Sequence, residues 1–167
     1  MSRVYILRHA QAEPGMRDHS RSLTQYGQLQ TQLMGQWLKL NLHELDLAIV
    51  SSARRTQHTF TGLGLDIEMI SDDRAYNAGS STLETLIREL GQGHEDVMIV
   101  AHNPGVSDLA SRAGYGQAMS PCECVVLEFD GPMTQFAAEN SHVVLWHQSR
   151  PQLIPRANLL IRFVAPS

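Results

Sequence analysis

The chain has 167 residues, a length that fits one domain large enough to bury a hydrophobic core. Hydrophobic residues make up 43% of it and charged residues 18%, an ordinary globular balance, and the formal charge of -4 argues against nucleic-acid binding. No apolar run approaches the roughly 20 residues of a membrane span, so no membrane segment is expected.

Strand-like and helix-like segments alternate through the first half of the chain. A β-branched run predicts a strand over 4–7, and after a polar loop a helix is expected from about 24 to 40. Its apolar residues at helical spacing are Leu29, Leu33, Trp37 and Leu40. A second strand is expected over 46–50, then a helix of about ten residues capped by Ser51-Ser52 and ending at Gly62 or Gly64, and a third strand over 67–70.

The second half continues this alternation and then changes character. Ser81-Thr82-Leu83-Glu84 has the pattern of a capping box, which predicts a helix that stops at Gly91. A fourth strand over 97–100 is followed by Asn103-Pro104, a pair suited to opening a helix. Two further strands are expected over 123–129 and 142–146. The whole pattern predicts an α/β fold with a mostly parallel sheet.

Residues 1–150 are expected to form one domain, with 151–167 as a partly apolar tail packed on it. The tail adds an edge strand, covers the sheet or serves a partner subunit, and the sequence does not decide among these. Met1 leads directly into a strand, so no signal peptide is expected. Cys122 and Cys124 are expected in the core rather than in a disulfide, which favours a cytoplasmic location.

Two histidines stand where strands end. Arg8-His9 follows the first strand, and His102 follows the fourth and precedes a helix whose free N–H groups attract anions. Ligands of open α/β sheets bind beyond the carboxyl ends of the strands. A strand-end histidine is a nucleophile when a hydrogen bond holds one ring nitrogen and the other faces the substrate, and an adjacent guanidinium grips two phosphoryl oxygens. Ordinary loop or structural roles are the alternatives.

Three arginines and one carboxylate add to this picture. Arg54 and Arg55 lie in a first helical turn, where cations oppose the helix dipole, so each points into solvent or binds an anion. In the polar loop, Asp18 is a candidate proton donor and Arg21 a candidate phosphate contact, although an exposed salt bridge between them fits equally well.

The remaining histidines show no spacing typical of metal ligands, and we expect them on the surface: His43, His58, His94, His142 and His147. No Walker or dinucleotide-binding glycine pattern is present in the sequence. Neither a metal nor a cofactor is therefore expected.

Several of these motifs together resemble the histidine phosphatase superfamily, and most of all its small bacterial phosphohistidine phosphatases of the SixA group. The motifs are Leu7-Arg8-His9, then Ser51, Arg55 and Thr59, then Ala101-His102-Asn103-Pro104. The loop Asp18, Arg21, Leu23, Thr24 and Gly27 also fits that group, as does Tyr76-Asn77-Ala78. The resemblance covers about residues 3 to 130 and implies a small single domain of phosphoglycerate mutase-like, three-layer α/β fold, with helices on both faces of a mostly parallel sheet.

The resemblance also implies a mechanism. His9 attacks phosphorus and becomes phosphohistidine, Arg8, Arg55 and His102 clamp the phosphoryl oxygens, and Arg21 and Asn103 contact the substrate. Arg55 is preferred to Arg54 because its spacing to Thr59 matches the family. Two residues depart from the family pattern: Ala10 replaces a glycine, and Gln11 stands where relatives often carry an acid.

The implied function is a phosphatase that removes the phosphoryl group from phosphohistidine in a protein, such as a histidine-containing phosphotransfer domain. One alternative is a phosphomonoesterase that acts on a small metabolite. Another is a phosphate-binding module without catalysis, although binding alone does not require a nucleophile such as His9.

Overall fold

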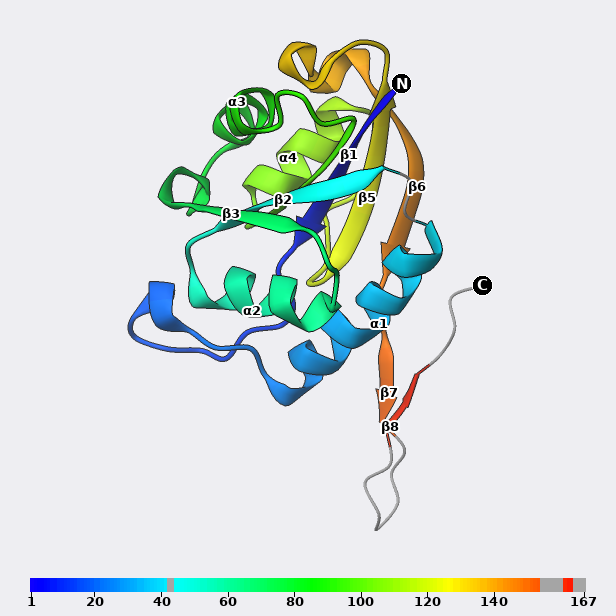
Figure 1. Cartoon of the computed structure of the whole chain (residues 1–167). Helices are drawn as coiled ribbons and strands as arrows, with labels where there is room; N and C mark the ends of the chain where they lie inside the picture. Colours follow the sequence, from blue (N-terminus) through cyan, green and yellow to red (C-terminus); the bar gives the residue numbers. More distant parts are fainter. Residues whose placement is uncertain (42–43, 154–160, 164–167) are drawn as a thin grey trace.

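The chain folds around a six-stranded sheet in the order β3-β2-β4-β1-β5-β6, as seen in the computed structural model of Figure 1. The structure describes residues 1–41, 44–153 and 161–163. The strands of this sheet are β1 (Ser2–Arg8), β2 (Leu45–Ser51), β3 (Glu68–Asp72), β4 (Asp96–Ala101), β5 (Glu123–Phe129) and β6 (His142–Gln148). The helices are α1 (Gln25–Asn41), α2 (Arg54–Leu63), α3 (Ser80–Leu90) and α4 (Gly105–Arg112).

The sheet is mixed, and its central part is parallel. β3, β2, β4 and β1 run parallel to one another, while β5 and β6 are antiparallel additions at one side. Helices α1 and α2 cover one face of the sheet, and α3 and α4 cover the other (Figure 1). The predicted three-layer α/β class with helices on both faces is therefore confirmed.

Alternation along the central strands explains the two hydrophobic cores. In β1, Val4 and Ile6 pack towards α3 and α4, whereas Tyr5 and Leu7 pack towards α1 and α2. All four side chains are fully buried. Such runs are buried on both faces, which is why they read in the sequence as continuous apolar segments.

The buried face of α1 differs from the predicted apolar stripe. Leu33 is buried, but Leu40 is 86% exposed, and the buried residues of the helix also include Gly27, Met34 and Leu38. Gly27 lies so close to the backbone of Gln11 that a Cβ there would sit 2.1 Å from the Gln11 carbonyl oxygen. Close backbone approach, which apolar spacing does not register, sets the orientation of this helix.

Two predicted helix caps are also wrong. No side chain caps α2, whose N-cap is Ala53, and none caps α3, which begins one residue earlier than the predicted box. Glu84, the presumed box acid, is buried and instead accepts hydrogen bonds from Arg112 and from the backbone N–H of Ala138. The predicted stops hold, since α2 ends at Gly64 in a left-handed conformation and α3 ends at Gly91.

Beyond β6 the chain forms β7 (Pro151–Leu153), which pairs antiparallel with β8 (Ile161–Phe163) in a separate two-stranded sheet. This hairpin extends away from the main sheet in Figure 1. The rest of the predicted tail, 154–160 and 164–167, lies outside the described residues, so the domain boundary at 150 stays a prediction. Among the described helices, none combines the length and apolar character needed to cross a membrane.

Candidate active site

His9 lies directly beyond the end of β1 and is 8% exposed. Its Nδ1 is 2.7 Å from the carbonyl oxygen of Ala10. Because a carbonyl oxygen only accepts, Nδ1 carries the proton in this hydrogen bond, and Nε2 keeps a free lone pair. Nε2 makes no hydrogen bond to any described residue. The ring is thus held in the orientation and tautomer that a nucleophilic imidazole requires.

The two departures from the family pattern are accommodated locally. Ala10 donates its backbone N–H to Thr59 Oγ1 at 3.0 Å, which ties the end of β1 to α2. Among the described residues other than glycine, only Asn77 and Cys122 have a positive φ, so Ala10 needs no glycine-like conformation. Gln11 accepts a hydrogen bond from the Thr24 hydroxyl at 2.8 Å and serves to anchor the start of α1.

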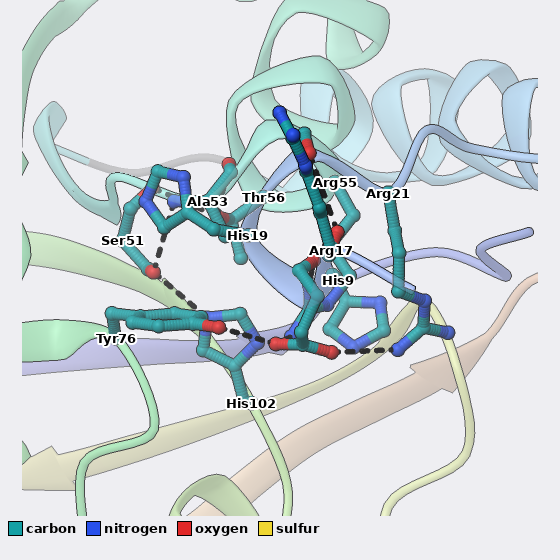
Figure 2. Close-up of polar contacts among 12 residues, drawn as sticks. His9, Arg17, His19, Arg21, Ser51, Ala53, Arg55, Thr56, Tyr76 and His102 are labelled. Atoms are coloured by element: carbon teal, nitrogen blue, oxygen red, sulfur yellow. Dashed lines mark hydrogen bonds and ion pairs between the residues drawn. The ribbon is translucent and has the colours of Figure 1, made fainter. Parts of the chain in front are cut away.

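Arg55 points into the same region from the first turn of α2, and it is 4% exposed (Figure 2). Its guanidinium donates to the backbone oxygen of Asp18 at 2.8 Å and to the Asp18 carboxylate at 3.1 Å. The neighbouring Arg54 is exposed. The structure therefore places Arg55 beside Asp18 and leaves Arg54 exposed.

Arg8 and Arg21 are each held by a backbone carbonyl. Arg8 donates to the backbone oxygen of Met119 at 2.9 Å, and Arg21 donates to the carbonyl of Glu13 at 2.7 Å. The Nε atoms of Arg8 and Arg55 and the Nδ1 of His102 are all buried without a hydrogen-bond partner. Buried polar atoms left unpaired cost free energy, and an anion held among these side chains would supply partners for such atoms.

Asp18 occupies the centre of this cationic cluster. Its carboxylate accepts hydrogen bonds from Tyr76, from Arg21 at 3.0 Å and from Arg55 at 3.1 Å. The Tyr76 hydroxyl, followed by Arg21 and Arg55, holds the pKa of Asp18 well below its usual range. The carboxylate is therefore ionised at neutral pH. In this geometry the carboxylate only accepts hydrogen bonds, and the role of Asp18 as a proton donor stays a prediction.

His102 follows β4 and lies with its ring centroid 5.4 Å from that of His9. Its Nε2 is 2.7 Å from the hydroxyl of Ser51, at the end of β2. Asn103 lies next in the chain, but its side-chain amide donates to the Met119 carbonyl and accepts from the Ser107 hydroxyl. This side chain therefore does not cap α4, and the substrate contact expected for Asn103 stays a prediction.

Three residues near the site were not among the predicted site residues. Tyr76 binds Asp18 and packs edge-on against His102, with ring centroids 5.6 Å apart. His19 packs edge-on against Tyr76 and is hydrogen bonded to Ser52. Ser51 binds His102. Tyr76 and Ser51 belong to the family-like motifs, which marked their positions without indicating what they contact.

The electrostatic environment keeps both histidines neutral. Burial lowers the pKa of His9 to about 4, and the positive charges of Arg55, Arg8 and Arg21 act in the same direction against the opposing hydrogen bond to Ala10. Burial, then Arg55 and His9, lower the pKa of His102 to about 3. An unprotonated His9 at neutral pH is a competent nucleophile without any activating base.

This assignment predicts an NMR titration. We expect the ring signals of His9 and His102 to stay in their neutral positions from pH 8 down to pH 5, where free histidine is mostly protonated. Both pKa values are lower in the folded state than in the unfolded state, so the unfolded state binds more protons below pH 6.5. The free energy of unfolding should then fall on acidification towards pH 4, by about 1 kcal/mol per pH unit for each histidine. Either ring titrating near pH 6.5 would contradict the assignment.

The other histidines mostly meet expectation. His58 and His142 are exposed, His94 is partly exposed and pairs with Asp46, and His43 lies outside the described residues. His147 is the exception, because it is buried and stacks on Trp37 with centroids 4.8 Å apart. Cys122 and Cys124 are buried free thiols, as predicted. Within the described part of the chain, no cluster of three or more histidine, cysteine or acidic side chains has the geometry of a metal site.

No family model matches the chain, but a search of known proteins finds similar sequences. An uncharacterized protein of Mycobacterium tuberculosis is 32% identical over 106 residues, which cover 62% of this chain and 67% of that protein. A protein of Haemophilus influenzae named phosphohistidine phosphatase SixA homolog is 29% identical over 166 residues, which cover 89% of this chain and 96% of the homolog.

Solved structures show the same fold. A structure assigned as SixA from Nakamurella multipartitia superposes with a TM-score of 0.80 at 22% identity, over 88% of this chain and 95% of that one. The protein histidine phosphatase SixA complexed with tungstate gives a TM-score of 0.70 at 23% identity, over 87% and 96% of the two chains. The chain therefore has the fold of these SixA structures and is similar over most of its length to the Haemophilus influenzae protein named as a SixA homolog.

Proposed function

We propose that this chain removes the phosphoryl group from phosphohistidine in a protein, by way of a phosphohistidine intermediate on His9. The observation that carries the proposal is the state of His9. Its Nδ1–H is fixed on the Ala10 carbonyl, its Nε2 is free, and cationic side chains surround it. A site built only to bind phosphate needs the cations but not an imidazole held with one free lone pair.

The proposed reaction has two displacements at phosphorus. In the first, His9 Nε2 forms a bond to phosphorus while the bond from phosphorus to the substrate imidazole breaks. In the second, water attacks the phosphorus on His9, the bond to Nε2 breaks, and inorganic phosphate leaves. Arg8, Arg55 and His102 hold the phosphoryl oxygens through both steps, and Arg21 assists. The unpaired donors of Arg8, Arg55 and His102 are the groups available for this work.

The leaving group favours phosphohistidine over an alkyl phosphate. An alkoxide is a poor leaving group that needs a well-placed acid, whereas an imidazole protonated on its other nitrogen leaves as a neutral molecule. Asp18 is ionised in the free protein, and Gln11 is bound to Thr24. The name of the Haemophilus influenzae homolog points to the same substrate class.

A protein substrate also suits the exposure of the site. The loop before α1 is largely exposed, and the Asp18 side chain at the centre of the cluster is 46% exposed. A histidine-containing phosphotransfer domain would present its phosphohistidine to such a surface. We further propose that residues 1–150 form the phosphatase domain and that the protein acts in the cytoplasm, where the free thiols of Cys122 and Cys124 stay reduced.

A substrate panel tests this function. Purified protein is assayed against a phosphohistidine protein, p-nitrophenyl phosphate and common alkyl phosphomonoesters, each with and without a chelator. We expect phosphohistidine and the aryl phosphate to be preferred and the chelator to have no effect. If an alkyl phosphate is hydrolysed with kcat/KM of about 10⁴ M⁻¹s⁻¹ or above while phosphohistidine is ignored, the protein is instead a small-molecule phosphomonoesterase.

The position of Asp18 predicts that Asp18→Asn tightens anion binding. The carboxylate repels a phosphate or vanadate ion that must share Arg21 and Arg55 with it, and asparagine removes the charge at nearly constant size. A gain of about 1 kcal/mol is expected, roughly a fivefold lower Kd for vanadate by titration calorimetry. Asp66→Asn is the matched control. Asp66 is exposed and precedes β3, so it lies at the end of the strands opposite to the site. Weaker vanadate binding by Asp18→Asn would show instead that the carboxylate serves to hold the arginines for substrate.

A further inference from the structure

Ser51 is a fully buried hydroxyl at the end of β2, and its Oγ lies 2.7 Å from His102 Nε2 (Figure 2). The same Oγ is 3.4 Å from the backbone nitrogen of Ala53, which donates to it. With the Ala53 N–H as donor, the Ser51 proton is free to point elsewhere. Among the described residues, the only acceptor it meets is His102 Nε2.

The two tautomers of neutral His102 differ in the polar groups they leave unpaired. If Nε2 carried the proton and donated to Ser51, the buried Ser51 hydroxyl proton would have no acceptor, and the Nδ1 lone pair would also be unpaired. If Ser51 donates to Nε2, only the Nδ1–H remains without a partner. The second arrangement leaves fewer buried groups unsatisfied and is the more stable one.

The remaining Nδ1–H belongs to a buried ring that lies next to His9. The ring of His102 lies between Ser51 and His9 in Figure 2, and it is 3% exposed. The positive charges of Arg55 and Arg8 disfavour its protonated form, against the opposing charge of Asp18. These positive charges and the burial keep the ring neutral, so His102 can donate a hydrogen bond from Nδ1 only in the Nδ1–H tautomer.

We propose that Ser51 is a positioning residue that fixes His102 in its Nδ1–H tautomer, so that a neutral histidine donates a hydrogen bond to a phosphoryl oxygen. The inference rests on the proposed function for its consequence in catalysis, but the tautomer itself is a property of the free protein. In the transition state the donor would act on the growing negative charge, as the backbone and side-chain donors of oxyanion sites do.

The test combines ring ¹⁵N NMR with kinetics on three variants of the full chain. Wild type is expected to show the Nδ1–H pattern for His102, and added vanadate is expected to shift that proton. Ser51→Ala should lose the preference for this tautomer and lower kcat/KM on phosphohistidine about 10- to 100-fold, the size of effect seen when a partner that orients a metal-ligating histidine is removed. Ser51→Thr, which keeps the hydroxyl, should restore the tautomer and most of the rate.

Ser52→Ala is the matched control. Ser52 adjoins Ser51, but its hydroxyl contacts the exposed His19, so both the His102 tautomer and the rate should stay as in wild type. An Nε2–H pattern in the wild-type protein, or an unchanged tautomer and rate in Ser51→Ala, would overturn the inference. If no phosphohistidine substrate is hydrolysed by the wild type, the proposed function fails, and the tautomer of His102 still decides the role of Ser51.

Discussion

His9→Ala is expected to lower kcat/KM on phosphohistidine by about 10⁴-fold or more, because it removes the Nε2 lone pair that is held free among Arg8, Arg55 and Arg21. The fold should survive, since His9 lies beyond the end of β1 and is absent from both hydrophobic cores. Circular dichroism and urea unfolding of the variant check this point. His58→Ala, an exposed histidine on α2, should leave turnover unchanged.

The same variant decides whether the intermediate is covalent. Rapid quench of wild type with ³²P-labelled substrate should trap an acid-labile, base-stable phosphoenzyme, as expected of a phosphoramidate, and His9→Ala should trap none. Near-normal turnover by His9→Ala would rule out the proposed mechanism. If the wild type forms the phosphoenzyme but does not turn over, the step that fails is the second displacement, in which water attacks the phosphorus.

Much of this site could be predicted because it depends on local sequence. Each of β1, β2 and β4 stops next to polar residues, and parallel strands bring their carboxyl ends to one edge of a sheet. His9, Arg55 and His102 follow those three strand ends, so their convergence follows from strand order alone. The pairing of β1 with β4 and of β4 with β2 is the arrangement that this argument needs.

The parts that sequence reasoning missed depend on contacts between distant segments. The ionisation of Asp18 is set chiefly by Tyr76, 58 residues further along the chain, and the tautomer of His102 by Ser51, 51 residues earlier. Likewise, Glu84 has the spacing of a capping-box acid, but its carboxylate accepts a hydrogen bond from Arg112 of α4. In each case a hydrogen bond between segments far apart in the sequence decides the state of the residue. Such a hydrogen bond is stronger when it is buried than when it is exposed to water.

The adjacent arginines Arg54 and Arg55 give the sharpest test of the phosphoryl clamp. Arg55→Ala is expected to cost about 3 kcal/mol in transition-state stabilisation, since it removes a charged fork aimed at oxygens on which charge develops. This corresponds to a loss in kcat/KM of somewhat more than a hundredfold. Arg54→Ala removes the same charge one residue away, from an exposed position, and should cost less than a tenth of that factor.

The comparison of Arg54→Ala with Arg55→Ala separates the effect of a direct contact from the effect of long-range electrostatic attraction. Both substitutions change the net charge equally, so any effect of long-range attraction on substrate binding appears in both and falls at high salt. The effect specific to Arg55 should persist in salt and appear in kcat as well as KM, because the buried guanidinium acts on the reacting group itself. Arg55→Lys should recover only part of the rate, since an ammonium lacks the two parallel N–H donors of the fork. If Arg54→Ala proved the more damaging variant, Arg54 rather than Arg55 would face the site. The match of Arg55 to the family motif, based on its spacing to Thr59, would then be in error by one residue.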